Sequence, residues 1–175
     1  MISFLVTIFI GILTLLFEST ALHAFSLHAC MPNLTLILVA YFALFFGKEK
    51  GRRLGLILGL IQDLLFCPVL GFYGMIFFLI GHLCGALTSH LAEFDLLIPL
   101  GLVLLSDLIY GTISYFVFGF LQGKLQFFLF LRERILPEAI YTLLIALVMF
   151  PVFKWALQRL LLLDEIRDRK RRRRA

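Results

Sequence analysis

The sequence has few charged residues and no long polar stretch. Charged side chains make up 15% of the 175 residues and hydrophobic ones 62%, and the mean hydropathy is +1.03. Soluble domains are about 45–50% apolar. Apolar runs of about 20 residues, the length that crosses a bilayer as a helix, recur along the chain. We therefore predict an all-α integral membrane protein with no soluble domain.

Motifs that bind metals or carry catalysis are missing as well. Cys30, Cys67 and Cys84 form no CxxC pair, and the chain has no phosphate-binding loop, HExxH or GxSxG motif. His23, His28 and Cys30 could be read as a metal cluster, but histidines in a short loop are more often simply polar loop residues, which is the reading we adopt. Cys30 and Cys67 are both expected near the outer surface, either paired or as two thiols. We predict no metal, no cofactor and no enzymatic activity.

Positive charge is concentrated in two places. Basic residues gather in the loop 47–53 and in the tail 164–175, which ends in Arg171, Arg172, Arg173 and Arg174. The positive-inside rule places both in the cytoplasm, where the arginines would attract anionic lipid. Binding of nucleic acid by the tail is the less favoured reading, and we predict none. The chain is thus divided into a transmembrane domain, 1–163, and a basic cytoplasmic tail, 164–175.

Six transmembrane helices are predicted, which places both termini in the cytoplasm. They span Ile2–Leu22, Asn33–Phe46, Leu54–Phe66, Phe72–Leu91, Leu96–Phe120 and Pro137–Trp155. Asn33 is expected to cap the second, and Pro137 with Glu138 is typical of a helix start. The apolar piece Leu125–Leu131 is too short to span and is expected to lie at the membrane interface or to re-enter it. The first segment lacks a basic leader and is expected to be retained.

Glycines at helical spacing mark the hairpin from Gly51 to Gly85, on both sides of a turn at Pro68. Glycines four, seven or eleven residues apart lie on one helix face, where small residues let backbones approach closely in a membrane. The predicted residues for helix packing or partner binding are Gly51, Gly55, Gly59, Asp63, Gly71, Gly74, Gly81 and Gly85. The groove that they line would be filled by a helix of this chain or by a partner's transmembrane helix.

Three acids, Glu18, Asp63 and Asp107, lie within predicted spans. Acids inside a membrane are costly, so they face protein or water and are candidates for function. Each could be part of a proton path, a cation path or a polar pocket. Alternatively, each is a structural contact that fixes helix register, and we favour this structural reading. Asp63 is expected to make a cap-like contact with the outer turn, and Glu18 to be hydrated among the lipid headgroups.

Several stretches together resemble the rod shape-determining protein MreD family. They are Pro32–Leu38 (PNLTLIL), Gly55–Leu65 (GLILGLIQDLL), Leu70–Gly74 (LGFYG) and Leu136–Tyr141 (LPEAIY). Their order and spacing, together with the length, the number of spans and the basic tail, extend the resemblance over nearly the whole chain. The resemblance implies a fold like that of the substrate-binding subunits of energy-coupling-factor vitamin transporters.

The resemblance also implies a function. It is that of a non-catalytic scaffold of the cell-wall elongation machinery, in the bacterial cytoplasmic (inner) membrane, that maintains rod shape. The implied partners are MreC, MreB, RodA and a class B penicillin-binding transpeptidase. The alternative is a substrate-binding membrane subunit of a vitamin-type transporter, with Asp63, Asp107 and Tyr110 near the ligand.

Overall fold

The computed structural model describes residues 2–24, 32–66, 69–87, 96–119 and 127–172, with only the backbone described at the end of α1 and over most of α7 beyond Ala156. These residues form helices and no strand, which confirms the all-α prediction. The α-helices are α1 (Ile2–Ala24), α2 (Leu34–Phe46), α3 (Lys48–Phe66), α4 (Phe72–Ala86), α5 (Leu97–Ser114), α6 (Phe127–Phe130) and α7 (Leu136–Arg172).

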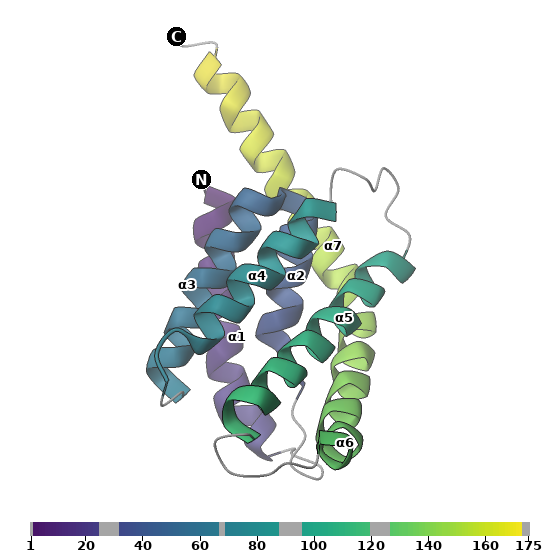
Figure 1. Ribbon diagram of the computed structural model, residues 1–175. Helices are drawn as coiled ribbons and strands as arrows, with labels where there is room; N and C mark the ends of the chain where they lie inside the picture. Colours follow the sequence, from purple (N-terminus) through teal and green to yellow (C-terminus); the bar gives the residue numbers. More distant parts are fainter. Residues whose placement is uncertain (1, 25–31, 67–68, 88–95, 120–126, 173–175) are drawn as a thin grey trace.

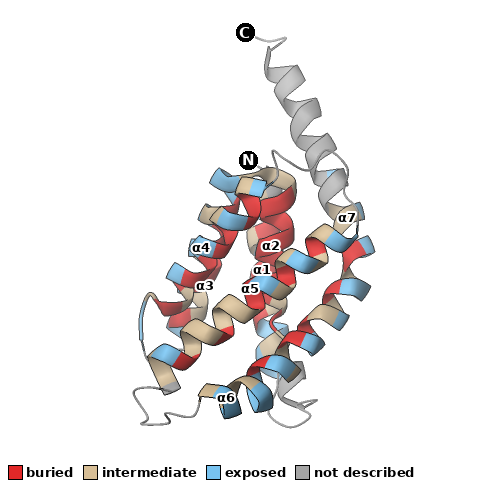
Figure 2. Cartoon of the chain, turned by 45° about the vertical axis from the view of Figure 1, so that its right-hand side comes forward, coloured by how far each residue is buried: buried red, intermediate tan, exposed pale blue. Residues whose placement is uncertain are grey.

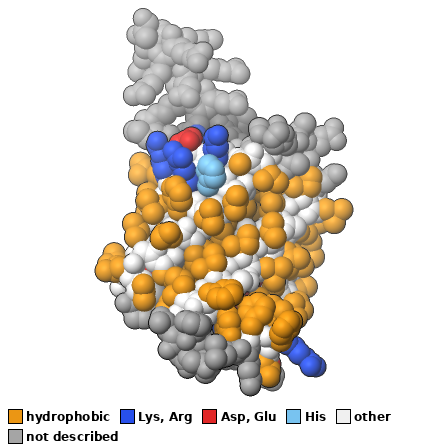
Figure 3. All heavy atoms as spheres, viewed as in Figure 1, with side chains coloured by type: hydrophobic (Ala, Val, Ile, Leu, Met, Phe, Trp, Pro, Cys, Tyr) orange, Lys and Arg blue, Asp and Glu red, His pale blue; other side chains and the backbone are white. Residues whose placement is uncertain are grey.

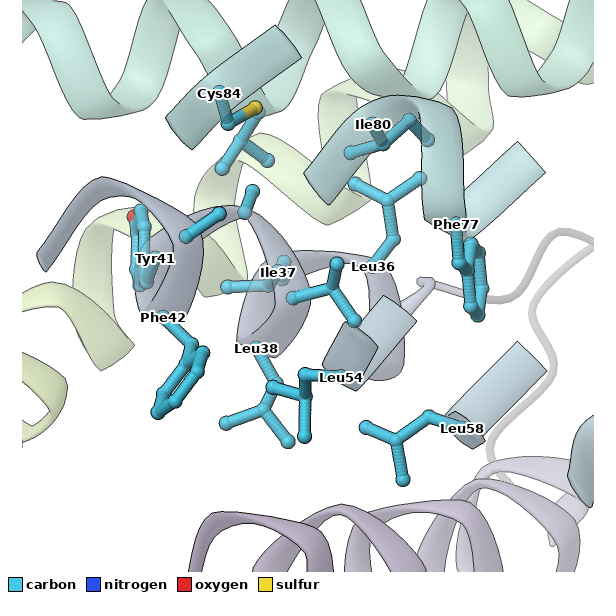
Figure 4. Packing of buried hydrophobic residues seen from close by; sticks show 14 of the residues in the cluster. Leu36, Ile37, Leu38, Tyr41, Phe42, Leu54, Leu58, Phe77, Ile80 and Cys84 are labelled. Carbon is cyan, nitrogen blue, oxygen red and sulfur yellow. The ribbon is translucent and has the colours of Figure 1, made fainter. Parts of the chain in front are cut away.

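Helix α2 lies at the centre of the bundle and contacts α1, α3, α4, α5 and α7 (Figures 1 and 2). Its ten residues from Thr35 to Leu44 are each at most 1% exposed. A helix that is apolar all round has to be buried on every side. Figure 4 shows the core that results, with α2 side chains facing Leu54 and Leu58 of α3 and Phe77 of α4. Asn33 caps α2 as predicted, its side chain accepting a hydrogen bond from Leu36 N at 2.9 Å.

The basic loop predicted between the second and third segments is instead the start of a helix. Helix α3 begins at Lys48, not at Leu54, directly after Gly47. Gly47 has φ of +85°, a conformation that glycine adopts readily and that turns the chain within one residue. Lys, Glu and Arg are good helix formers, so the charged residues join the helix. Helix α4 ends at Ala86, and the predicted end of the fourth span, Leu91, lies outside the described residues.

The predicted start of the last span at Pro137 is wrong. One continuous helical stretch runs from Phe127 through α6, a π-helical turn, η3 (Leu131–Ile135), and α7. Proline has no N–H to donate and its ring crowds the preceding turn. A wider π turn just before Pro137, in which Leu136 N donates to Leu131 O, accommodates it without ending the helix. Helix α5 likewise ends in a π turn, η2 (Tyr115–Gly119).

The bundle has a basic end and an apolar side. The start of α1, the α2–α3 turn, the start of α5 and the last part of α7 lie at one end, which we call the basic end (Figure 1). Figure 3 shows the lysines and arginines of the α3 start there, above a broad hydrophobic band. Exposed residues of that band include Met75 at 75% and Leu105 at 55%. Such a surface suits lipid contact.

Length and hydropathy single out two described stretches that could cross a membrane, Leu97–Phe118 and Phe127–Ala156. Phe4–Thr20, Leu34–Phe46 and Phe72–Ala86 are apolar but shorter. The six-span topology therefore stays a prediction.

Candidate functional site: polar contacts inside an apolar bundle

The glycine stripe of α3 packs against the glycine stripe of α4. A Cβ atom added to Gly59 would lie 2.5 Å from the Tyr73 carbonyl oxygen, and one added to Gly55 would overlap the Phe77 carbonyl oxygen. Towards the basic end, a Cβ on Gly51 would lie 2.7 Å from Gly81 O. The two antiparallel backbones are therefore in contact along both helices, an arrangement that only glycine permits.

This contact decides which helix fills the glycine groove. A partner's helix cannot enter between the two stripes, because each stripe already covers the other. Among the remaining glycines of the hairpin, Gly85 and Gly74 also contact α3. Gly71 differs, because a Cβ added to it would meet no described atom within 4 Å and its φ is +93°. Gly71 is thus a turn residue and not a packing residue.

Asp63 makes the cap-like contact that the sequence predicts. It lies in the last turn of α3, is 1% exposed, and accepts hydrogen bonds from Gly71 N at 3.1 Å, Tyr73 N at 2.9 Å and Gly74 N at 3.0 Å. The first N–H groups of a helix have no partner within the helix, and a carboxylate there also meets the favourable end of the helix dipole. Asp63 therefore joins α3 to the start of α4.

Glu18 has a similar contact, which the sequence did not predict. Its Oε1 accepts from Thr35 N at 2.8 Å and its Oε2 from Thr35 Oγ1 at 2.9 Å. The sequence suggested only hydration of Glu18 among the headgroups, whereas the start of α2 supplies two hydrogen-bond donors. Two of the three acids that the sequence places in spans, Glu18 and Asp63, therefore cap the helix that follows their own.

Asp107 is different. It is 2% exposed and accepts a hydrogen bond from the Thr142 hydroxyl of α7, while its Oδ1 has no hydrogen-bond partner among the described residues. The Thr142 hydroxyl also accepts a hydrogen bond from Asn33 N, the cap of α2, at 3.4 Å. Thr142 of α7 therefore links α7 to both α2 and α5. A buried carboxylate with one unsatisfied oxygen is expensive in a membrane protein. Within the described part of the chain, Asp107 neither caps a helix nor forms an ion pair that would offset its burial.

A polar stripe leads from Asp107 to the surface. Glu138 and Thr142 are four residues apart on α7, and Arg134 stands four residues before Glu138, in the η3 turn. Exposure increases along this series, from Thr142 at 0% to the half-buried Glu138 and the exposed Arg134. Glu138 lies within electrostatic range of both Asp107 and Arg134. We call these four residues the acid seam; it opens at the end of the bundle opposite the basic end.

The innermost residue of the seam, Thr142, is fully buried. The described residues hold no group of three His, Cys, Asp or Glu side chains that could bind a metal ion. Tyr110, expected beside a ligand, instead places its hydroxyl 3.2 Å from that of Tyr73. Cys30, Cys67 and the side chains of Arg171, Arg172, Arg173 and Arg174 lie outside what the structure describes.

Together these features define an all-α membrane protein in which buried polar side chains join neighbouring helices. A family model, that of rod shape-determining protein MreD, matches residues 1–160. The chain therefore belongs to the MreD family, a family of bacterial membrane proteins that determine rod shape. Comparisons with curated proteins and with solved structures gave no match.

Proposed function

We propose that the protein is a non-catalytic, multi-pass scaffold of the cell-wall elongation machinery in the bacterial inner membrane. In this role it maintains rod shape by binding MreC and, through the same assembly, MreB, RodA and a class B penicillin-binding transpeptidase. The observation that carries the proposal is the family match over residues 1–160. The bundle agrees with it, because its polar residues are used for helix contacts and its sides are apolar.

The partner's transmembrane helix is proposed to dock at the acid seam and not at the glycine stripes. Both stripes are covered by each other, whereas Asp107 keeps an unsatisfied oxygen and Glu138 is half-buried at the mouth of the seam. A basic or hydrogen-bonding side chain from the partner would pair with Glu138, which lies within electrostatic range of the buried Asp107. In a membrane, polar side chains of this kind join helices with about 1 kcal/mol each.

Isosteric variants test the docking site. Asp107→Asn and Glu138→Gln remove negative charge and keep the shape of each side chain. We expect tagged protein carrying both changes to reach normal levels in the membrane, to retain little MreC on purification in mild detergent, and to leave cells rounded. Glu133→Gln, the same kind of change at the exposed neighbouring acid, should retain MreC. Rod-shaped cells with full recovery of MreC from the double variant would refute docking at the seam.

The vitamin-type transporter subunit remains the alternative function. The groove between α1, α2 and α7 is apolar, and Tyr110 and Asp107 contact Tyr73 and Thr142, so the described contacts give this alternative less support. A thermal-shift screen of the purified protein against vitamins separates the two. A hit that vanishes with Asp107→Asn would favour the transporter over the scaffold.

A further inference from the structure

An apolar groove of about 350 Å³ runs along the side of the bundle between α1 and α7, with α2 as its floor. On α1 it is lined by Leu13, Thr14 and Phe17, and its floor includes Ile37, which is 1% exposed. The Thr14 hydroxyl donates to its own helix, at Ile10 O, 2.9 Å away. Because its only donor proton is used within α1, the Thr14 hydroxyl offers a ligand no donor, and the rest of the lining is apolar.

The size of the lining residues indicates what fills the groove. Transmembrane helices pack closely where glycine, alanine or serine lets their backbones approach. This groove is lined instead by Ile10, Leu13, Phe17, Leu34, Ile37, Met149 and Phe153, with Thr14 as its smallest side chain. Gly11 of α1 faces away from it, since a Cβ there would lie 2.6 Å from the Leu58 side chain. A flexible hydrocarbon chain suits such a lining better than a helix does.

One end of the groove comes close to positive charge. Lys154 follows the lining residue Phe153 directly, and its Nζ lies 5.8 Å from the centre of the Phe150 ring. One turn further towards the basic end, Arg159 stacks on Trp155, which is 64% exposed. Tryptophan with lysine or arginine is the combination that marks a membrane–water interface. A phosphate at this level would meet these cations.

We propose that the groove binds an anionic phospholipid, with one acyl chain between α1 and α7 and the phosphate at Lys154. The site goes beyond the scaffold function and does not depend on it. It also differs from general attraction of lipid to the C-terminal arginines, because it fixes the lipid in one place on the side of the bundle.

The test compares two tryptophan reporters of matched exposure. Trp155 is the single tryptophan of the chain, so Trp155→Phe gives a silent background. Leu13→Trp places a reporter in the groove, where Leu13 is 51% exposed, and Leu105→Trp places one on the lipid-facing side of α5, where Leu105 is 55% exposed. Each protein is reconstituted in phosphatidylcholine vesicles with increasing phosphatidylglycerol brominated on its acyl chains, which quenches nearby tryptophan.

A lipid site predicts that the groove reporter is quenched at a lower fraction of phosphatidylglycerol than the control reporter, which follows the bulk composition. One basic residue contributes about a fivefold preference for anionic lipid at a membrane surface. Lys154→Gln should therefore shift the groove curve to about fivefold higher phosphatidylglycerol and leave the control curve in place. Phe17→Trp, also in the groove, repeats the measurement in case the first reporter disturbs the site.

Three results would overturn the proposal. Coincident curves for groove and control would show ordinary solvation by bulk lipid. An unchanged groove curve in Lys154→Gln would remove the assigned phosphate contact. Groove reporters that no brominated lipid quenches would show that a protein helix occupies the groove.

Discussion

Replacing Gly55 by alanine should weaken the protein, although the same change in an open helix strengthens one. Alanine is favoured over glycine in a helix by about 1 kcal/mol. Gly101 of α5 is the matched control, because it is exposed and a Cβ there would have nothing within 4 Å. Gly101→Ala should therefore stabilise the protein slightly.

At Gly55 the new methyl group would overlap the Phe77 carbonyl oxygen, which is backbone and cannot rotate away. Helices α3 and α4 would have to separate, and the contacts at Gly51 and Gly59 on either side would loosen with them. Overpacking of this kind costs about 1–3 kcal/mol, and a rigid neighbour places it at the upper end. The two variants should then differ by about 3 kcal/mol in free energy of unfolding.

Thermal unfolding in mild detergent measures the difference. For a chain of this length, about 3 kcal/mol corresponds to roughly 10 °C in Tm. We expect Gly55→Ala to melt about that far below Gly101→Ala and near or below the unchanged protein. If Gly55→Ala melts as high as Gly101→Ala, the close contact of α3 with α4 is not present in the folded protein, and the reasoning fails.

Three further predictions concern the two helix-capping acids and the orientation of the chain in the membrane. Asp63→Ala should lower the free energy of unfolding by about 2–4 kcal/mol, because three backbone N–H groups lose a buried acceptor. The control is Leu64→Ala, which should change the free energy of unfolding little, since Leu64 is 73% exposed. Thr35→Val should cost about 1 kcal/mol by removing one hydrogen bond to Glu18, measured by the same unfolding. With the three natural cysteines replaced, a cysteine at Lys50 should be labelled by a membrane-impermeant thiol reagent only in inverted vesicles, and one at Phe128 only in intact spheroplasts; the opposite pattern would overturn the proposed orientation.

The packing face of the α3–α4 hairpin and its cap at Asp63 could be predicted because their signals are local. Glycines at helical spacing identify a close-packing face whatever that face meets. Asp63 is separated from α4, the helix that it caps, only by the short connection between α3 and α4. Asn33 is a cap for the same reason, since it contacts the third residue after it. What the spacing could not tell was whether the facing helix came from this chain or from a partner, because helices of both origins present the same kind of surface.

Contacts between distant segments could not be predicted from the sequence. Glu18 is capping α2 only because α1 and α2 lie side by side, which brings Thr35 to a residue 17 positions earlier. The link from Thr142 to Asn33 joins residues 109 positions apart. The helix through Pro137 was missed for a different reason. A proline after an apolar connection has the signature of a helix start, and only the π turn before it reveals that the helix continues.

The three acids predicted to lie in spans provide a comparison that separates structure from function. Glu18 and Asp63 each supply acceptors to a helix start that would otherwise lack them, so their expense is offset where they stand. Asp107 has Thr142 as its hydrogen-bond donor and an Oδ1 without one among the described residues. Residues that violate a local rule without compensation are expected at functional sites.

This comparison makes a distinct prediction for Asp107→Asn. Removing a poorly satisfied charge should leave the free energy of unfolding unchanged or raise it. The purified protein should nevertheless lose MreC. This combination is the trade-off expected when a residue is kept for function and not for stability. Unfolding and co-purification measured on the same preparation decide the matter. A loss of stability as large as that of Asp63→Ala would mean that Asp107, too, is a structural contact, and the docking site would then have to be sought on another face of the bundle.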